Sequence, residues 1–534
     1  MTRVLSEIRF TSIAILGIFV ALTSVPASAA QALSDIHPTL TIPGQEITQQ
    51  AVKWSEPTLS IPPHNPATCV GDWTKQGLEC VATLQQAIKN AKANGKIYVK
   101  PGFGAAENLS ITKAVTICPA EITPKSTNTT ASKMRCIEAP TRTRKFRLIR
   151  EDKTKPCIKL SGNAGVVRIS GMLLDDTPRS KKPCFISTGK KVKLSIEHSK
   201  LVNITMNLAT PNAVALQDVT FRYSNLDIKS VDKMTLRGEN VFYRSHLTLS
   251  DVGISKDPAP FEILSFTDGS ITATGSSSIH LRVGEFRKSG DFQQSDDDEV
   301  YVPGKLSISG TGSSSLTVGR FENSELVIGS SGSFKLSDSL FVNSGISVSG
   351  RAIRTVNGND FIDTQLELKH DGLLTVTGNT FLEEFVDEAI FEDEAPRRPS
   401  LLIASGVNQI SENRFLAACD LDFPLSQRDP ACACTKTPVL EFEVGASRST
   451  RFSENQVCTD EASWVRGTIT TDEVFRTNCL ITFDKSVGRD SRSLYNKSEY
   501  RRSKYPPKSE LIVTYVSPGR HPRDIEERCG EFLP

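Results

Sequence analysis

Basic side chains are clustered in one segment of the chain and again in a second segment further along. The ligand-binding candidates in these two places are Arg142, Arg144, Lys145, Arg147, Lys191 and Lys193. Because clustered cations attract carboxylates, this is the natural site for an acidic polysaccharide. An ordinary solvated surface accounts for each residue taken singly, whereas a contiguous stripe would favour binding. We expect Arg142, Arg144 and Lys145 to project from a strand edge whose inward residues include Phe146, Leu148 and Cys157.

Acidic side chains gather in two later stretches, residues 291–299 and 383–394. The first holds four consecutive carboxylates, the candidate Ca²⁺ ligands Asp296, Asp297, Asp298 and Glu299. Hard cations take carboxylate oxygens, but an ordered cage also needs a fixed turn, and no glycine stands at an EF-hand spacing. Two solvated acidic loops are the preferred interpretation, and a wall that binds Ca²⁺ or a cationic partner is the alternative. No other cofactor is predicted.

No catalytic residue can be assigned from a motif. The seven histidines are dispersed, none stands beside a candidate nucleophile in the sequence, and no HExxH, GxSxG, P-loop or GxGxxG run occurs. The catalytic residues are therefore unassigned.

The N-terminus and the cysteines indicate export. Arg3 and Arg9 precede the apolar run 13–22, and Ala27-Ser28-Ala29 is typical of a signal-peptidase site. An even count of cysteines in an exported chain predicts disulfides within the N-terminal six and within the C-terminal six, with Cys69–Cys80 the most favoured bridge. The two sets are Cys69, Cys80, Cys118, Cys136, Cys157 and Cys184, then Cys419, Cys432, Cys434, Cys458, Cys479 and Cys529.

A phenylalanine repeat indicates which elements carry these residues. Phe321, Phe341, Phe361 and Phe381 recur at one constant interval, and alternating apolar pairs follow each of them. An interval of about 20 residues with period-two alternation predicts short strands joined by corners, stacked as a solenoid with the rings in one column. Polar corners such as Asn323-Ser324 can bond to the backbone and to the next coil. The pattern runs upstream at Phe221, Phe242 and Phe266, and it continues less regularly to Phe286, Phe415, Phe452 and Phe475.

The period selects the type of solenoid. Left-handed hexapeptide helices have a shorter repeat, and pentapeptide helices need an apolar residue at every fifth place, where Ser331, Arg351 and Asp371 stand instead. We therefore predict an all-β fold, a right-handed parallel β-helix with coils of about 20 residues. Its ends should be stapled by disulfides. An amphipathic helix at 83–94, with Gly95 as its C-terminal cap, should close the N-terminal end.

The opening segment adds a family resemblance. The run TLQQAIKNAKANGKIYVKPG (83–102), followed by ENLSITKAVTI (107–117), resembles the start of pectin lyase-like right-handed β-helix proteins, and pectin methylesterase-like members are the most similar in wording. The resemblance implies the fold and favours carbohydrate substrates, but a fold does not fix a function. The paired-aspartate segments of the methylesterases have no match, and Asp218 is a poor catalytic candidate.

The predicted organisation has four parts. They are a signal peptide (1–29), an extended leader (30–79), the β-helix (80–483) and a basic tail folded back on the domain (484–534). The sequons at Asn108, Asn128, Asn203 and Asn496 are glycosylation candidates if the host secretes through an endoplasmic reticulum.

Two functions from different classes follow. The preferred one is a secreted binding or structural module for an extracellular or cell-surface polysaccharide or a surface protein. The alternative is a polysaccharide lyase, esterase or hydrolase of the pectin lyase-like superfamily. Export and the net charge of +2 disfavour nucleic acid as a partner, and no later stretch approaches the apolar length of a membrane span. We expect the protein to be extracellular, or in the periplasm or at the cell surface if the host is bacterial.

Overall fold

The computed structural model forms two compact units, and the residues that it describes belong to the second, Pro66–Pro534. It describes residues 68–70, 79–123, 133–162, 164–177, 182–189, 191–209, 211, 213–253, 261–276, 278–289, 304–351, 353–384, 399–418, 438–443, 446–459, 464–467, 478–482 and 511–515.

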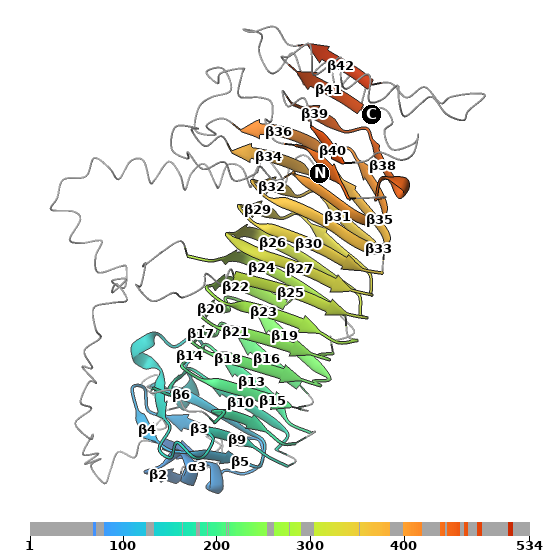
Figure 1. The fold of residues 1–534 in the computed structure, drawn as a ribbon. Coiled ribbons are helices and arrows are strands. Elements are labelled where there is room, and N and C mark those ends of the chain that lie inside the picture. The colour runs from blue at the N-terminus through green and yellow to red at the C-terminus, as the bar shows by residue number, and fades with distance from the viewer. Residues whose placement is uncertain are drawn as a thin grey trace, which may run out of the picture. The chain divides into compact units, whose positions relative to one another are not determined.

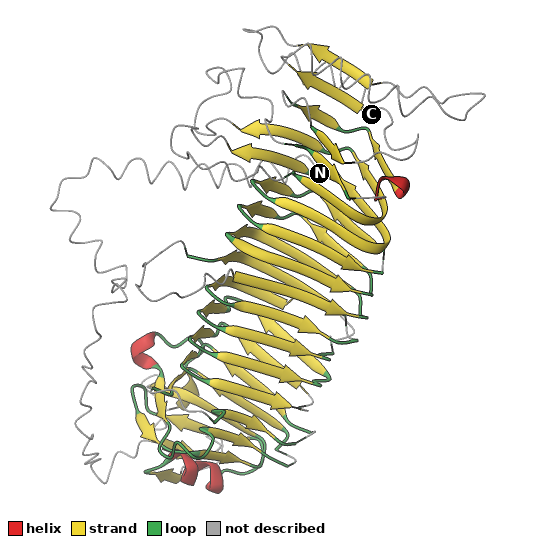
Figure 2. Ribbon diagram, viewed as in Figure 1, coloured by secondary structure: helices red, strands yellow, loops and turns green. Residues whose placement is uncertain are grey.

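Strands dominate this unit, and they stack in chain order (Figures 1 and 2). A nine-stranded sheet contains β1 (Thr68–Val70), β2 (Glu79–Val81), β3 (Gly95–Val99), β6 (Val115–Thr123), β7 (Lys133–Cys136), β10 (Val166–Ser170), β13 (Lys193–Glu197), β16 (Ala213–Gln217) and β19 (Lys233–Arg237). The remaining described strands form one continuous larger sheet that winds around the coils.

In the early coils the larger sheet forms the two sides that the nine-stranded sheet does not form. In the later coils it forms every side. Its first half contains β4 (Gly104–Ala106), β5 (Leu109–Ile111), β8 (Phe146–Ile149), β9 (Ile158–Leu160), β11 (Met172–Asp175), β12 (Phe185–Ser187), β14 (Lys200–Val202), β15 (Thr205–Ala209), β17 (Thr220–Arg222), β18 (Asn225–Lys229), β20 (Val241–Tyr243), β21 (His246–Ser250), β22 (Phe261–Thr267), β23 (Ser270–Thr274) and β24 (Ile279–Arg287). Its second half contains β25 (Gly304–Gly310), β26 (Ser314–Glu322), β27 (Ser324–Ser330), β28 (Phe334–Ser337), β29 (Leu340–Val342), β30 (Gly345–Gly350), β31 (Arg354–Asn357), β32 (Asp360–Ile362), β33 (Gln365–Thr377), β34 (Thr380–Glu384), β35 (Leu401–Ser411), β36 (Arg414–Ala418), β37 (Leu440–Phe442), β38 (Thr450–Ser453), β39 (Gln456–Cys458), β40 (Val465–Gly467), β41 (Asn478–Thr482) and β42 (Leu511–Tyr515).

The coils have three strand-forming sides, and the strand on each side pairs in parallel with its equivalent one coil away; in later coils a long strand such as β26 covers two of these sides. In one early coil the three strands are β13, β14 and β15, which pair with β16, β17 and β18 of the next. Parallel pairing between successive turns of the chain is the arrangement of a parallel β-helix, and the predicted right-handed fold is confirmed. Among the described pairs, only β1 with β2 and β3, and β6 with β7, are antiparallel.

The predicted phenylalanine column is confirmed and extends beyond the four rings that the repeat singled out. Successive rings stack at centroid separations of 4.7 to 5.4 Å, and every one is buried. The column holds Phe221, Phe242, Phe266, Phe286, Phe321, Phe341, Phe361, Phe381 and Phe415.

Two predicted members of the column need separate comment. Phe452 lies in register with Ile410, one side of the coil earlier, and Val457 takes the place above Phe415. The Phe452 ring still packs against that of Phe415, with centroids 5.9 Å apart, but it does not take a column position, because the segment between the two coils departs from the regular interval. Phe475 lies outside the described residues.

Buried amide side chains form a second column that runs beside the rings. Each asparagine after the first accepts hydrogen bonds from the backbone N–H and the side-chain amide of its equivalent one coil earlier, at 2.9 to 3.1 Å. Because a buried amide without partners would be costly, this continuous ladder fixes the coil spacing from inside. Its members are Asn359, Asn379, Asn413, Asn455 and Asn478.

The capping helix forms as predicted but ends early. Helix α3 (Leu84–Asn90) begins after Thr83, whose hydroxyl accepts a hydrogen bond from the Gln86 N–H, and buries Leu84, Ala87 and Ile88. The Glu107 carboxylate accepts the backbone N–H groups of Leu84 and Gln85 at 2.8 and 2.7 Å, which satisfies donors that the first turn leaves unpaired. Gly95 is not the cap: Ala91 ends the helix, and Gly95 begins β3.

The described ends of the chain add strands to the stack. β1 lies within the predicted leader and pairs with β3, whereas β42 lies within the predicted tail and pairs in parallel with β41. No helix in the described part of the chain is long and apolar enough to cross a membrane.

Candidate functional site: a basic strip beside an aromatic corner

The predicted basic segment precedes β8. Arg142–Arg144 form a 3₁₀ helix, η2, with exposed side chains, so the prediction of a strand edge at these residues was wrong. A strand would have carried alternate residues inward, but no apolar residue occurs among the three. Phe146, Leu148 and Cys157 are buried, as predicted.

Lys145 immediately precedes β8, and Lys200 begins β14, which lies two coils further along the stack. Burial lowers the pKa of Lys145, and the charge of Lys200 lowers it further. The pKa of Lys200 is lowered by burial, then by Arg222 and Arg142, against a smaller opposing effect of Asp175. Several positive charges therefore act on one another across these coils.

These four residues form one surface, which we call the basic strip: Arg142, Lys145, Lys200 and Arg222. It joins the segment before β8 to the strands β14 and β17, which are neighbours in the larger sheet. Lys145 and Lys200 are half-buried and Arg142 and Arg222 are exposed. Like charges this close repel one another, and a bound anion would relieve this repulsion. The strip can therefore hold a ligand with negative charges.

The other predicted cations lie around the strip or away from it. Arg144 shares η2 with Arg142, and Arg147 lies on β8 in the same register position as Lys200, with Leu173 between them. Lys193 begins β13 in the nine-stranded sheet, and Lys191 precedes it, so both belong to a different side of the coil.

An aromatic corner continues from the strip over the next two coils. We use this name for Tyr223, Tyr243 and Arg244. The two rings lie edge to face with centroids 5.7 Å apart, and the Arg244 guanidinium carbon lies 6.0 Å from the Tyr223 ring and 5.5 Å from the Tyr243 ring. Arg222 of the strip reaches the Tyr243 ring at 5.3 Å, which makes the two groups continuous.

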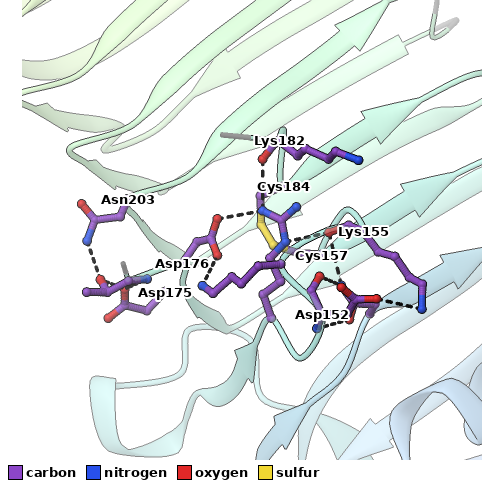
Figure 3. A network of polar contacts seen from close by, with 12 residues as sticks. Asp152, Lys155, Cys157, Asp175, Asp176, Lys182, Cys184 and Asn203 are labelled. Carbon is purple, nitrogen blue, oxygen red and sulfur yellow. Dashed lines mark hydrogen bonds and ion pairs between the residues drawn. A yellow bond between two sulfur atoms is a disulfide. The ribbon is translucent and has the colours of Figure 1, made fainter. Parts of the chain in front are cut away.

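Another charged network lies inside the first coils (Figure 3). The buried Arg150 donates to Asp176 at 2.9 Å and to the carbonyls of Lys155 and Lys182 at 2.6 and 3.0 Å. Lys153 donates to the other Asp176 oxygen at 2.6 Å. Arg150 therefore ties together the two loops that lead into the Cys157–Cys184 disulfide.

This network is not a metal centre. A carboxylate oxygen of Asp176 and the sulfur atoms of Cys157 and Cys184 lie within 4.8 Å of one another, the only such group found in the described part of the chain. The sulfurs are joined in a disulfide and cannot act as thiolate ligands, and cations already occupy both carboxylate oxygens. The arrangement is a structural one.

The described disulfides connect cysteines of the same terminal set where both partners are identified. Cys118 pairs with Cys136 and Cys157 with Cys184, while Cys458 and Cys479 are also disulfide-bonded. The antiparallel register of β1 and β2 places Cys69 opposite Cys80, and the bridge between them stays a prediction. Cys419, Cys432, Cys434 and Cys529 lie outside the described residues.

Two sequons lie in described segments. The Asn108 side-chain amide donates to the carbonyls of Asp152, Lys155 and Pro156. It therefore fixes a loop and is a poor glycosylation site in the folded chain. Asn203 donates to the Thr177 hydroxyl at 2.5 Å from a partly exposed corner. Asn128 and Asn496 lie outside the described residues, as do Asp296, Asp297, Asp298 and Glu299.

Two histidines that are isolated in the sequence meet serines in the fold. His246 Nδ1 lies 2.7 Å from the Ser270 hydroxyl, and His280 Nδ1 lies 2.7 Å from that of Ser315. Both pairs are outward neighbours on adjacent parallel strands, where the ladder uses the backbone N–H groups. They are therefore cross-strand contacts between residues one coil apart.

No family model, curated protein or solved structure matches this chain. The site is therefore described by its own geometry alone.

Sequence reasoning missed half of the strip and all of the aromatic corner. Lys200 stands singly, and Arg222-Tyr223 and Tyr243-Arg244 are two separate pairs one coil apart, so no longer local run marks them. The signal lies in the coil register: Tyr223 and Arg244 stand two places after Phe221 and Phe242, where other coils carry asparagine or aspartate.

Proposed function

We propose that this protein is an exported β-helix module that binds an acidic extracellular polysaccharide along the basic strip. The observation that carries the proposal is the parallel register from β8 through β11 and β14 to β17, which gathers Lys145, Lys200 and Arg222 on successive coils beside the exposed Arg142. The lowered pKa of Lys200, in which the charges of Arg222 and Arg142 take part, agrees with this arrangement. A polymer with carboxylates along its length would neutralise several of these cations at once.

The chain's opening segment supports a carbohydrate ligand. Its likeness to pectin lyase-like proteins is consistent with the parallel β-helix, and we assign the chain to that superfamily as part of this proposal. The catalytic segments of the methylesterases have no counterpart in the sequence. Binding without bond cleavage is therefore the preferred function.

The direct test is binding of the purified full-length protein to immobilised polygalacturonate, alginate and heparin, with dextran as the neutral control. We expect binding to the acidic polymers that weakens as salt rises, because partly exposed charges are screened. The same samples, assayed for unsaturated uronate, reducing ends and methanol, test the alternative that the protein is an enzyme.

Charge-removing variants locate the site. Lys145→Gln with Lys200→Gln should weaken binding by about 10-fold for each lysine without lowering the melting temperature, because two repelling charges are removed. The matched control is Lys191→Gln with Lys193→Gln, which removes the same charge from another side of the coil. Equal losses in the two double variants would contradict the site, and no binding to any polymer would contradict the function.

A further inference from the structure

One corner of the coil takes the left-handed backbone conformation again and again. It lies two residues after the position of the ring column, and its φ angles lie between 45° and 54°. In five coils the residue there is asparagine or aspartate, whose short polar side chains tolerate this conformation. These are Asn203, Asp268, Asn323, Asn343 and Asp363.

Tyr223 and Arg244 occupy the same corner in two consecutive coils, with φ of 50° and 46°. For such residues the left-handed conformation costs free energy, because Cβ crowds the carbonyl and no short polar group compensates. Asparagine gains more at this corner: the Asn343 amide donates to the Asn323 side-chain oxygen at 2.8 Å. Strain in single residues is retained where a function or the surrounding structure requires it.

These two strained residues are members of the aromatic corner, next to the basic strip. Tyr223 is 41% exposed, so much of its surface is open to a ligand. The Arg244 side chain is 40% exposed, lies near both tyrosine rings, and is oriented by Asp268, with Nε 3.8 Å from a carboxylate oxygen. Both guanidinium groups, those of Arg222 and Arg244, lie against the Tyr243 ring, which packs edge to face with Tyr223.

We propose that Tyr223 and Arg244 form the subsite that binds one sugar of the acidic chain. The Tyr223 ring stacks on the apolar face of the sugar, while Arg244 and Arg222 donate hydrogen bonds to its carboxylate. This inference rests on the proposed function and names the residues that recognise a uronate, as distinct from any polyanion. The strain at both corners is the cost of presenting these side chains.

The test replaces each strained residue by the asparagine found in other coils. Tyr223→Asn and Arg244→Asn should each weaken binding of a polygalacturonate oligosaccharide by about 10-fold or more. Their melting temperatures should stay level or rise, by roughly 1–3 °C, because asparagine suits the backbone. The carboxyl-reduced oligosaccharide is neutral and should bind wild type weakly. Its affinity should fall less in Arg244→Asn than in Tyr223→Asn.

Asn343→Tyr is the matched control, since it places tyrosine at the same corner away from the basic strip. It should lower the melting temperature and leave binding unchanged. Unchanged binding in Tyr223→Asn and Arg244→Asn would overturn the subsite, as would a loss of binding accompanied by a fall of several degrees in melting temperature. If wild type binds heparin as tightly as polygalacturonate, the strip is only a polyanion surface. If wild type binds no glycan, the proposed function itself fails.

Discussion

Phe361 lies between two rings of the column, with centroid separations of 5.3 Å to Phe341 and 4.7 Å to Phe381, and it is 1% exposed. Replacing a ring in such a stack leaves a cavity that the rigid coils above and below cannot close. Phe361→Ala should therefore lower the free energy of unfolding by about 3–5 kcal/mol. Chemical denaturation followed by circular dichroism measures this, with Ile362→Ala, at the outward neighbour, as the control. A loss below about 1 kcal/mol would show that the column does not hold the coils together.

For single residues, the sequence predicted a structural role only where the same role recurs in successive coils. The rings recur at a constant interval and bury the same face, so their spacing is sufficient to align them. The asparagine ladder carried a comparable signal, because Asn359, Asn379 and Asn413 each stand two places before a column phenylalanine. Tyr223 and Arg244 carried a weaker signal, because they break the repeat at a position where other coils carry asparagine or aspartate, and their left-handed φ is visible only in the fold.

At the scale of elements, β31, β33 and β35 enclose buried polar residues where other coils are apolar. Arg354 is fully buried and donates to the carbonyls of Gly350 and Ser330. The His370 ring donates from Nε2 to the Asn408 side-chain oxygen at 2.9 Å, and its Nδ1 accepts the Gly372 N–H at 3.2 Å. A ring nitrogen that accepts a hydrogen bond carries no proton, so the His370 ring is neutral.

This geometry makes the stability of these coils sensitive to acid. Burial lowers the pKa of His370, and the charge of Arg354 lowers it further, although the bond to Asn408 opposes both. Below the ordinary histidine value of 6.5 the unfolded chain takes up a proton that the folded ring refuses. Stability is therefore present above that pH and is lost as pH falls towards the folded pKa.

His370→Gln should reduce this loss, because glutamine can donate to Asn408 without titrating. The measurement is the free energy of unfolding between about pH 7.5 and about pH 5, compared with wild type and with His246→Gln, whose ring is exposed. An unchanged slope in His370→Gln would contradict the assignment.

Element boundaries were predicted less well than element types, for local reasons. The helix α3 was indicated by its buried face, but Ala91 ends it before the glycine that the pattern favoured. The segment before β8 alternates charge in a way that suited a strand, whereas Arg142–Arg144 bury nothing and turn as a 3₁₀ helix. In both places the backbone conformation is determined by packing against the next coil, which cannot be read from the local sequence.

At the scale of the whole molecule, the parallel stack makes each coil an interchangeable unit whose contacts are with its two neighbours. Deleting residues 320–339 removes one coil and joins Gly319 to Leu340. Phe341 then lies over Phe286, and Ile346 and Val348 over Leu306 and Ile308, because each replaces its equivalent from one coil earlier in the same register.

We expect this variant to retain a β-rich circular dichroism spectrum, a cooperative thermal transition and wild-type binding to polygalacturonate, since the basic strip lies in other coils. Deleting residues 320–329 is the control, because half a coil brings Ser331 to the ring position and carries every later ring away from the column. That chain should lose its cooperative transition. If both variants keep a cooperative transition, the register of the rings and amides does not determine the stack. If only the full-coil deletion fails to fold, the deleted coil makes contacts beyond its two neighbours.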